Sequence, residues 1–240
     1  MTTRITGISS MASRDVLAEL ADAYLQHSGV EVVFESVGGV DAAKRVRDGE
    51  PFDVVVLASD AIDRLVTSGQ LVADSKTDLV RSVVAIAVRA GMAQPDISSE
   101  QELRRVVLSA RSIGYSTGPS GVALRKLFER WGIADAIRNR IVEAPPGIPV
   151  GQLVAKGEVD LGFQQLSELM GLPGIAILGT MPSGTEIVTI FSAGLCTTSH
   201  QPEAVRALLA FMRSPLVADA KRRHGMEPVN PSRTTQGMLQ

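Results

Sequence analysis

Cysteine is nearly absent from this sequence of 240 residues, in which Cys196 is the only one. A single thiol excludes an internal disulfide and a cysteine-rich metal cluster. Cys196 ends the apolar run from Ile190 to Leu195, where a buried, unreactive thiol is the simpler interpretation and a nucleophile the alternative. The three histidines lie far apart with no metal-ligand spacing. We therefore expect no metal site and no cofactor.

The sequence also lacks an excess of charge of one sign and any long apolar run. Its formal net charge of −2 gives no electrostatic footprint for nucleic acid, so an anionic ligand must be small and held locally. No apolar run reaches the roughly 18 residues of a membrane span. Only Met1 to Arg4 precede the first predicted strand, which leaves no room for a signal peptide. We expect a cytoplasmic protein, or a periplasmic one if an export signal was removed.

Hydrophobic residues make up 45% of the chain and charged residues 21%, as in ordinary globular proteins. Short apolar runs alternate with longer amphipathic stretches, a pattern that predicts an α/β fold with a parallel sheet and crossover helices. The predicted strands are 5–8, 30–36, 53–58, 83–88, 112–115, 141–143, 161–164, 175–178 and 187–196. Helices are predicted to begin near residues 13, 40, 60, 99, 121, 149 and 201. Pro228 to Thr235 is expected to be irregular.

Four polar turns rich in small residues follow predicted strands directly. Ligands of open α/β sheets bind at the carboxyl ends of the strands, so we expect these turns to converge on one cleft that binds a small anion. The candidate ligand-binding residues are Ser9, Ser10 and Met11 in the first turn, Gly38 and Gly39 in the second, Ser116, Thr117, Gly118, Ser120 and Gly121 in the third, and Gln164 and Gln165 in the fourth.

The turn between Tyr115 and the next helix has the chemistry of an anion cradle. Its glycines allow close backbone approach, its hydroxyls donate hydrogen bonds, and the helix that follows presents free N–H groups. The spacing is not that of a P-loop. An ordinary turn with a helix N-cap would use the same residues, so both interpretations stay open.

The other turns have simpler alternatives too. Gly38 and Gly39 can be plain turn residues, and Ser9 and Ser10 can cap the first helix. Paired amides at Gln164 and Gln165 need hydrogen-bond partners if they are buried, which a cleft wall would provide.

Several motifs, taken in order, resemble those of the molybdate-binding family of solute receptors over almost the full chain. They are I-T-G-I-S-S-M-A-S, S-V-G-G-V-D, D-G-E-P-F-D-V-V-V-L-A-S-D, T-G-P-S-G and G-E-V-D-L-G-F. The resemblance implies a type II periplasmic-binding-protein fold, with two Rossmann-like lobes and a ligand cleft between them. It implies crossing strands near 81–88 and 187–196, a first lobe of residues 1–82 and 189–240, and a second lobe of residues 83–188.

The chain departs from this family at the ligand. The positions that correspond to the receptors' oxyanion-binding hydroxyls hold Ala12, Gly39 and Gln165 here, which argues against molybdate. Two positions where the family uses backbone N–H groups correspond to Ser120 and Gly147, so the resemblance adds Gly147 to the ligand-binding residues.

The chain is also similar to the aconitate isomerases of the same fold, which shift a double bond within a tricarboxylate. That reaction needs clamped carboxylates and a group that moves a proton between allylic carbons. Possible clamping cations are Arg14, Lys44, Arg81 and Arg125, each of which also fits a solvated surface charge. Candidate proton carriers are Glu35, Asp41, Tyr115 and Ser120, of which we assign Ser120 and Tyr115 as catalytic.

Two functions therefore stay open. The first is an isomerase for a small polycarboxylate, and the second is a receptor that delivers an oxyanion or organic anion to a transporter partner. Both bind a small anion, and neither involves nucleic acid or a membrane segment. The missing export signal favours the isomerase, whereas the lack of an evident acid–base pair favours the receptor. We prefer the isomerase.

Overall fold

The computed structural model describes residues 4–145 and 147–229. Its strands are β1 (Arg4–Ser10), β2 (Glu31–Val37), β3 (Val54–Ala58), β4 (Thr77–Arg89), β5 (Ile113–Ser116), β6 (Ile141–Ala144), β7 (Leu161–Gln165), β8 (Ile175–Thr180), β9 (Val188–Leu195) and β10 (Met226–Pro228). Its α-helices are α1 (Arg14–Ser28), α2 (Gly39–Arg47), α3 (Ser59–Thr67), α4 (Glu100–Ser109), α5 (Pro119–Arg130), α6 (Ala134–Ile137), α7 (Val150–Lys156), α8 (Leu166–Leu169), α9 (Pro202–Arg213) and α10 (Ala218–Arg223). Short 3-10 turns are η1 (Met11–Ser13), η2 (Arg138–Arg140) and η3 (Pro215–Val217).

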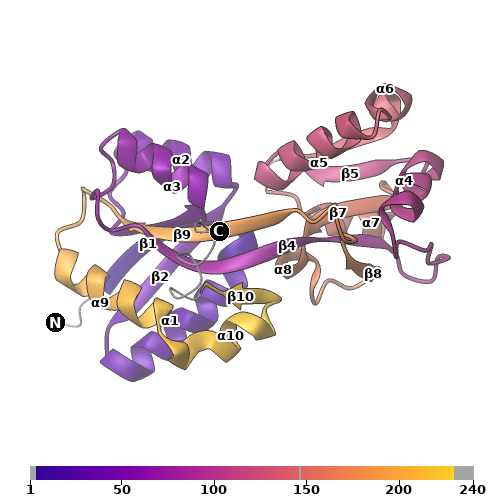
Figure 1. Ribbon diagram of the computed structural model, residues 1–240. Helices are drawn as coiled ribbons and strands as arrows, with labels where there is room; N and C mark the ends of the chain where they lie inside the picture. The colour runs from indigo at the N-terminus through magenta and orange to yellow at the C-terminus, as the bar shows by residue number, and fades with distance from the viewer. Residues whose placement is uncertain (1–3, 146, 230–240) are drawn as a thin grey trace, which may run out of the picture.

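The strands form a curled mixed sheet with the order β2-β1-β3-β9-β4-β7-β5-β6, and β8 and β10 pair with β4. Figure 1 shows two lobes that are joined by the long strands β4 and β9. This is the two-lobed α/β fold expected from the sequence. The sheet is mixed rather than parallel as predicted, because the crossing strands β4 and β9 run antiparallel to their neighbours.

In the first lobe, β1 runs parallel to β2 and β3, and helices cover both faces of the sheet. Ile5 and Val54 pack toward α1 and α9, whereas Ile8 and Val55 pack toward α2 and α3. The whole of β3 is buried, because its V-V-V-L-A sequence is apolar on both faces. Such a strand is typical of a sheet covered by helices on both sides.

The second lobe repeats this arrangement around β5, which runs parallel to β6 and β7. Ile113 and Tyr115 face a core formed with α4, α5 and α6, while the glycine between them faces Val150 and Val159 on the α7 side. The two-residue period of the strand thus separates the two layers.

β4 changes its partners along its length. Val83 is paired with Val188 of β9, whereas Val84 is paired with Gln165 of β7. β4 therefore passes from one lobe into the other, and its 13 residues extend well before the predicted start at Val83. This switch supports the proposed lobe boundary after residue 82.

Some short elements differ from the sequence expectation. Met226–Pro228 forms β10 against β4, so Pro228, the first residue of the predicted irregular tail, is the last residue of a strand. The part of the tail beyond residue 229 lies outside the described residues. The helices α6, α8 and α10 were not predicted, because four to six residues are too few to show a helical period.

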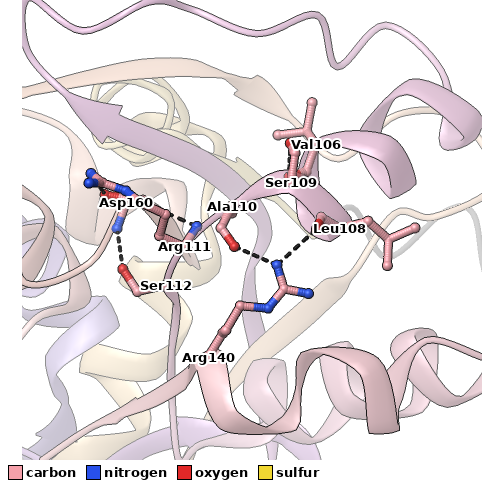
Figure 2. Close-up of polar contacts among 8 residues, drawn as sticks. All are labelled: Val106, Leu108, Ser109, Ala110, Arg111, Ser112, Arg140 and Asp160. Carbon is pink, nitrogen blue, oxygen red and sulfur yellow. Dashed lines mark hydrogen bonds and ion pairs between the residues drawn. The ribbon is translucent and has the colours of Figure 1, made fainter.

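Structural polar contacts tie together the amino ends of β5 and β7 (Figure 2). Arg111 forms a two-pronged ion pair with Asp160, and the Ser112 hydroxyl accepts a hydrogen bond from the Asp160 N–H at 2.9 Å. Arg140 donates to the carbonyls of Leu108 and Ala110 and thereby satisfies the end of α4. These contacts lie at the amino ends of the strands, opposite the carboxyl ends at which ligands of open α/β sheets bind.

Candidate functional site

Hydroxyls cluster where β1 and β2 end. Ser9 and Ser36 are register partners, and their Oγ atoms lie 2.8 Å apart. The Ser10 and Ser13 hydroxyls lie 3.3 Å apart, and Ser13 also donates to the Ser10 carbonyl. Neither Ser10 nor Ser13 makes a side-chain cap bond to the helix that follows, so capping does not account for these hydroxyls.

The glycine pair lies beside this cluster. Gly38 is the N-cap of α2, and Gly39 is its first residue. A Cβ atom on Gly39 would lie 3.6 Å from the Ser10 Cβ, so the start of α2 adjoins η1, to which Met11 belongs. The first N–H groups of α2 therefore lie close to the serine hydroxyls, a set of donors of the kind that suits a small anion.

Gln164 and Gln165 end β7 in the second lobe, and both are buried. The Gln164 side chain accepts from the Gly151 N–H at 3.1 Å and donates to Glu168 at 2.9 Å. Gln165 donates to the Thr189 hydroxyl at 2.8 Å, and its Oε1 has no donor among the described residues. Gln165 therefore keeps one buried polar atom for another partner.

The third predicted turn begins α5, whose first residues lie on the side of the second lobe that faces the first lobe (Figure 1). Ser116, Gly118 and Ser120 are partly buried there, and Thr117 is exposed. Gly121 has a packing role instead: a Cβ atom on it would lie 1.8 Å from the Ser116 carbonyl oxygen. Close helix–strand packing therefore explains this glycine without a ligand.

Tyr115 faces the core under α5, where its ring lies against Gly121 of the third turn. Its ring is buried under α5 and lines a pocket of about 220 Å³ with residues of α5, α6 and β6. Burial and nearby Glu143 raise the pKa of Tyr115, which keeps the phenol protonated and unable to accept a proton. Gly147 lies after β6 with a positive φ of 78°, exposed in a turn. The residue pattern alone does not distinguish a core position from a cleft position for Tyr115.

Glu168 in α8 was missed by the sequence reasoning. It is partly buried, and it accepts the hydrogen bond from Gln164. Burial raises the pKa of Glu168 to about 7, although the Gln164 hydrogen bond and the Arg14 charge act in the opposite direction. The sequence carried no signal for this contact, because Gln164 ends a strand and Glu168 lies in a four-residue helix.

The first and second lobes touch at this point. The Ser167 hydroxyl in α8 donates to the Ala12 carbonyl of η1 at 2.9 Å. Arg14 is the first residue of α1, and its charge lies near enough to lower the pKa of Glu168. The Arg14 Nε bonds to Asp15 at 2.8 Å. The turn after β1 and the turn after β7 therefore meet across the two lobes.

The remaining sequence candidates are engaged elsewhere or exposed. Lys44 pairs with Asp48, Glu35 pairs with Arg45, and Arg125 lies 3.5 Å from Glu143. Arg45 holds the pKa of Glu35 below its usual range, so Glu35 is a weak base. Asp41 is exposed in the first turn of α2, and Arg81 lies opposite Glu227 in the sheet.

Neither the cysteine nor a metal offers alternative chemistry in the described ranges. Cys196 is buried, and burial raises the pKa of its thiol to about 12, so a thiolate nucleophile is disfavoured. Within residues 4–145 and 147–229, no group of three acidic, histidine or cysteine side chains is placed to bind a metal ion.

The comparisons with known proteins agree with this geometry. Residues 5–227 match the model of a family described as bacterial extracellular solute-binding protein. The chain is 39% identical to an aconitate isomerase of a Pseudomonas species, over 95% of this chain and 88% of that protein. It is 21% identical to the molybdate-binding protein ModA of Escherichia coli K12, over 92% and 88% of the two chains.

Solved structures show the same fold. The periplasmic molybdate-binding protein of Azotobacter vinelandii aligns with a TM-score of 0.77 at 20% identity, over 95% of this chain and 99% of that one. The resemblance to molybdate receptors and aconitate isomerases is thus confirmed. In the described part of the chain, no helix is long and apolar enough to cross a membrane. The family description does not support the expected cytoplasmic location. From its fold, its site and its sequence, the chain belongs to the bacterial extracellular solute-binding protein family.

Proposed function

We propose that this protein binds a small polycarboxylate where its two lobes meet, and that it isomerises this ligand by an allylic proton shift. The observation that carries the proposal is the 39% identity to an aconitate isomerase across 95% of the chain. The two molybdate-binding relatives are only 21% and 24% identical over similar lengths. The enzyme is thus the much nearer relative.

The donor set supports a carboxylate ligand. Serine hydroxyls and the start of α2 lie on one lobe, and the Gln165 amide lies on the other. The Thr189 hydroxyl can accept from the amide nitrogen or donate to the amide oxygen, so Gln165 can present either atom to a ligand. Such donors can hold carboxylates at separate points, as a tricarboxylate requires.

The chemistry requires one proton to leave one carbon and one to arrive at another. Clamped carboxylates fix the carbon skeleton, so the enzyme needs only an acid–base group beside the allylic carbons. The site offers hydroxyls, amides and one partly buried carboxylic acid, and this set suffices for a proton shift.

A receptor is the second candidate. The molybdate-binding relatives and the structural similarity to a periplasmic molybdate-binding protein favour it, because the same lobes can close on an anion without changing it. In that case the protein would deliver the ligand to a transporter partner.

Incubation with cis-aconitate and, separately, trans-aconitate in deuterated water tests the proposal. We expect proton NMR to show both samples approaching the same isomer mixture, with deuterium entering the product, because proton removal and return is the chemistry. Calorimetric titrations with both aconitates, molybdate and sulfate provide the binding control. Saturable binding of an aconitate without interconversion would contradict the isomerase and support the receptor.

A further inference from the structure

An acidic side chain is held rigidly at the junction of the two lobes. α8 begins directly after Gln165 and packs against β4 and η1. Met170 follows the last residue of α8, and a Cβ atom on Gly225 of the first lobe would lie only 2.6 Å from the Met170 Sδ. The end of α8 therefore contacts the first lobe. Glu168 thus sits on an element that contacts both lobes.

One oxygen of this carboxyl group is fixed, and the other is available. Gln164 donates to Oε1 at 2.9 Å, which orients the group. Across the described ranges, Gln164 is the only residue that donates a hydrogen bond to Glu168. Oε2 can therefore meet a ligand that binds beside the glutamines.

The protonation state of Glu168 suits a proton carrier. Its burial raises its pKa to about 7, so both forms are populated near neutral pH. The groups that face it from the neighbouring elements are the Gln164 amide of β7 and the Arg14 guanidinium at the start of α1, and both favour the ionised form. The effect of burial on the pKa of Glu168 is larger than the opposing effects of these two groups.

The other candidates for this role fit less well. Tyr115 lies in the separate pocket under α5, and Glu35 is held ionised by Arg45. Ser120 is partly buried at the start of α5 but has no base among its described hydrogen-bond partners to activate it.

We infer that Glu168 is the catalytic residue that moves the proton in the isomerisation; this inference rests on the proposed function. Oε2 takes a proton from the CH₂ carbon of the bound polycarboxylate. The C–H electron pair forms a new C=C bond to the central carbon, and the old C=C pair takes a proton from Glu168 at the former vinyl carbon. One C–H bond breaks and one forms, with no change in oxidation state.

Glu168→Gln tests the inference, because it keeps the shape and the Gln164 contact but cannot carry a proton. Loss of general acid–base catalysis costs typically 100- to 10,000-fold in rate, roughly the drop in kcat that we expect. Trans-aconitate binding, measured by calorimetry, should be retained. The matched control is Glu158→Gln, an exposed glutamate after α7, which should turn over like the parent protein.

Two further readouts separate the possible outcomes. Glu168→Asp should restore part of the turnover, and the parent's kcat should change with pH near 7 whereas the residual activity of Glu168→Gln should not. Full turnover by a folded Glu168→Gln, or a parent-like pH profile in it, would overturn the role of Glu168 and leave the isomerase standing. If Glu168→Gln does not fold, a Glu168→Asp variant with a parent-like kcat and pH profile would overturn the role of Glu168. An unmodified protein that binds aconitate without turnover would overturn the proposed function itself.

Discussion

Two glycines in the candidate loops are glycine for different physical reasons. A Cβ atom at Gly39 would make ordinary contacts of 3.6 and 3.9 Å with Ser10 and Leu57, so the fold tolerates a side chain there. At Gly121 the same atom would meet the Ser116 carbonyl oxygen at 1.8 Å. The loop sequences alone could not separate these cases, because both glycines lie in the first turn of a helix.

Substituting both glycines separates binding from packing. Gly39→Ala should lower ligand affinity because the methyl group stands where the anion approaches the start of α2. Its melting temperature should stay level or rise, since alanine at a compatible position stabilises by roughly 0.4–1 kcal/mol. Gly121→Ala should instead destabilise by about 1–3 kcal/mol or more, as overpacking does. Calorimetry and thermal melts measure both, and unchanged affinity in Gly39→Ala would remove Gly39 from the site.

Tyr115 shows a limit of residue-level reasoning. Its two-residue spacing from Ile113 correctly places both side chains on one face of β5. The sequence does not tell which face of β5 carries the ligand. The structure places the face of Ile113 and Tyr115 in the core under α5. Glu168 shows the reverse case, because an acid in a four-residue helix leaves no periodic pattern to detect.

At the scale of elements, the predicted strands lie where the apolar runs indicated, because buried parallel strands produce continuous apolar sequence. The first half of β4 was missed, since Thr77, Asp78 and Arg81 interrupt the apolar pattern where the strand crosses between lobes. The short helices and β10 were missed for lack of length. The candidate site was predicted at the ends of β1, β2, β5 and β7, and Glu168 on α8 was not predicted.

Buried polar side chains lie on and beside the crossing strands β4 and β9, where the fold alone does not require them. Ser82 pairs with Thr189, and Val84 pairs with Gln165, so the Ser82, Thr189 and Gln165 side chains share one face of the sheet. Ser82 Oγ and Gln165 Oε1 are buried, and neither has a hydrogen-bond partner in the described structure. Each unpaired buried group costs about 1–3 kcal/mol, which suggests retention for binding.

Gln165→Leu tests whether Gln165 is retained for ligand binding rather than for stability. The variant removes a buried unpaired acceptor together with the hydrogen bond to Thr189, so the two effects offset and its free energy of unfolding should change by less than about 1 kcal/mol. It should bind aconitate about tenfold or more weakly, the effect of one lost hydrogen bond to a charged group. Denaturant melts and calorimetry give the two numbers. A less stable variant with parent-like affinity would show that Gln165 is purely structural.

At the scale of the whole molecule, β4 and β9 join the lobes while η1 and α8 touch across them. We propose lobe boundaries after residues 82 and 188, one residue before β4 exchanges β9 for β7 and at the first residue of β9. The ends of β1 and β2 on one lobe and of β7 on the other then flank a single ligand.

A crystal structure with propane-1,2,3-tricarboxylate tests the convergence most directly. This saturated analogue has the three carboxylates of aconitate but no double bond, so it can bind and cannot react. We predict that its carboxylates contact both lobes, with the Ser9 to Met11 turn and the start of α2 on one side and Gln165 with Glu168 on the other. A ligand bound to one lobe alone, or in the pocket beside Tyr115, would contradict the account.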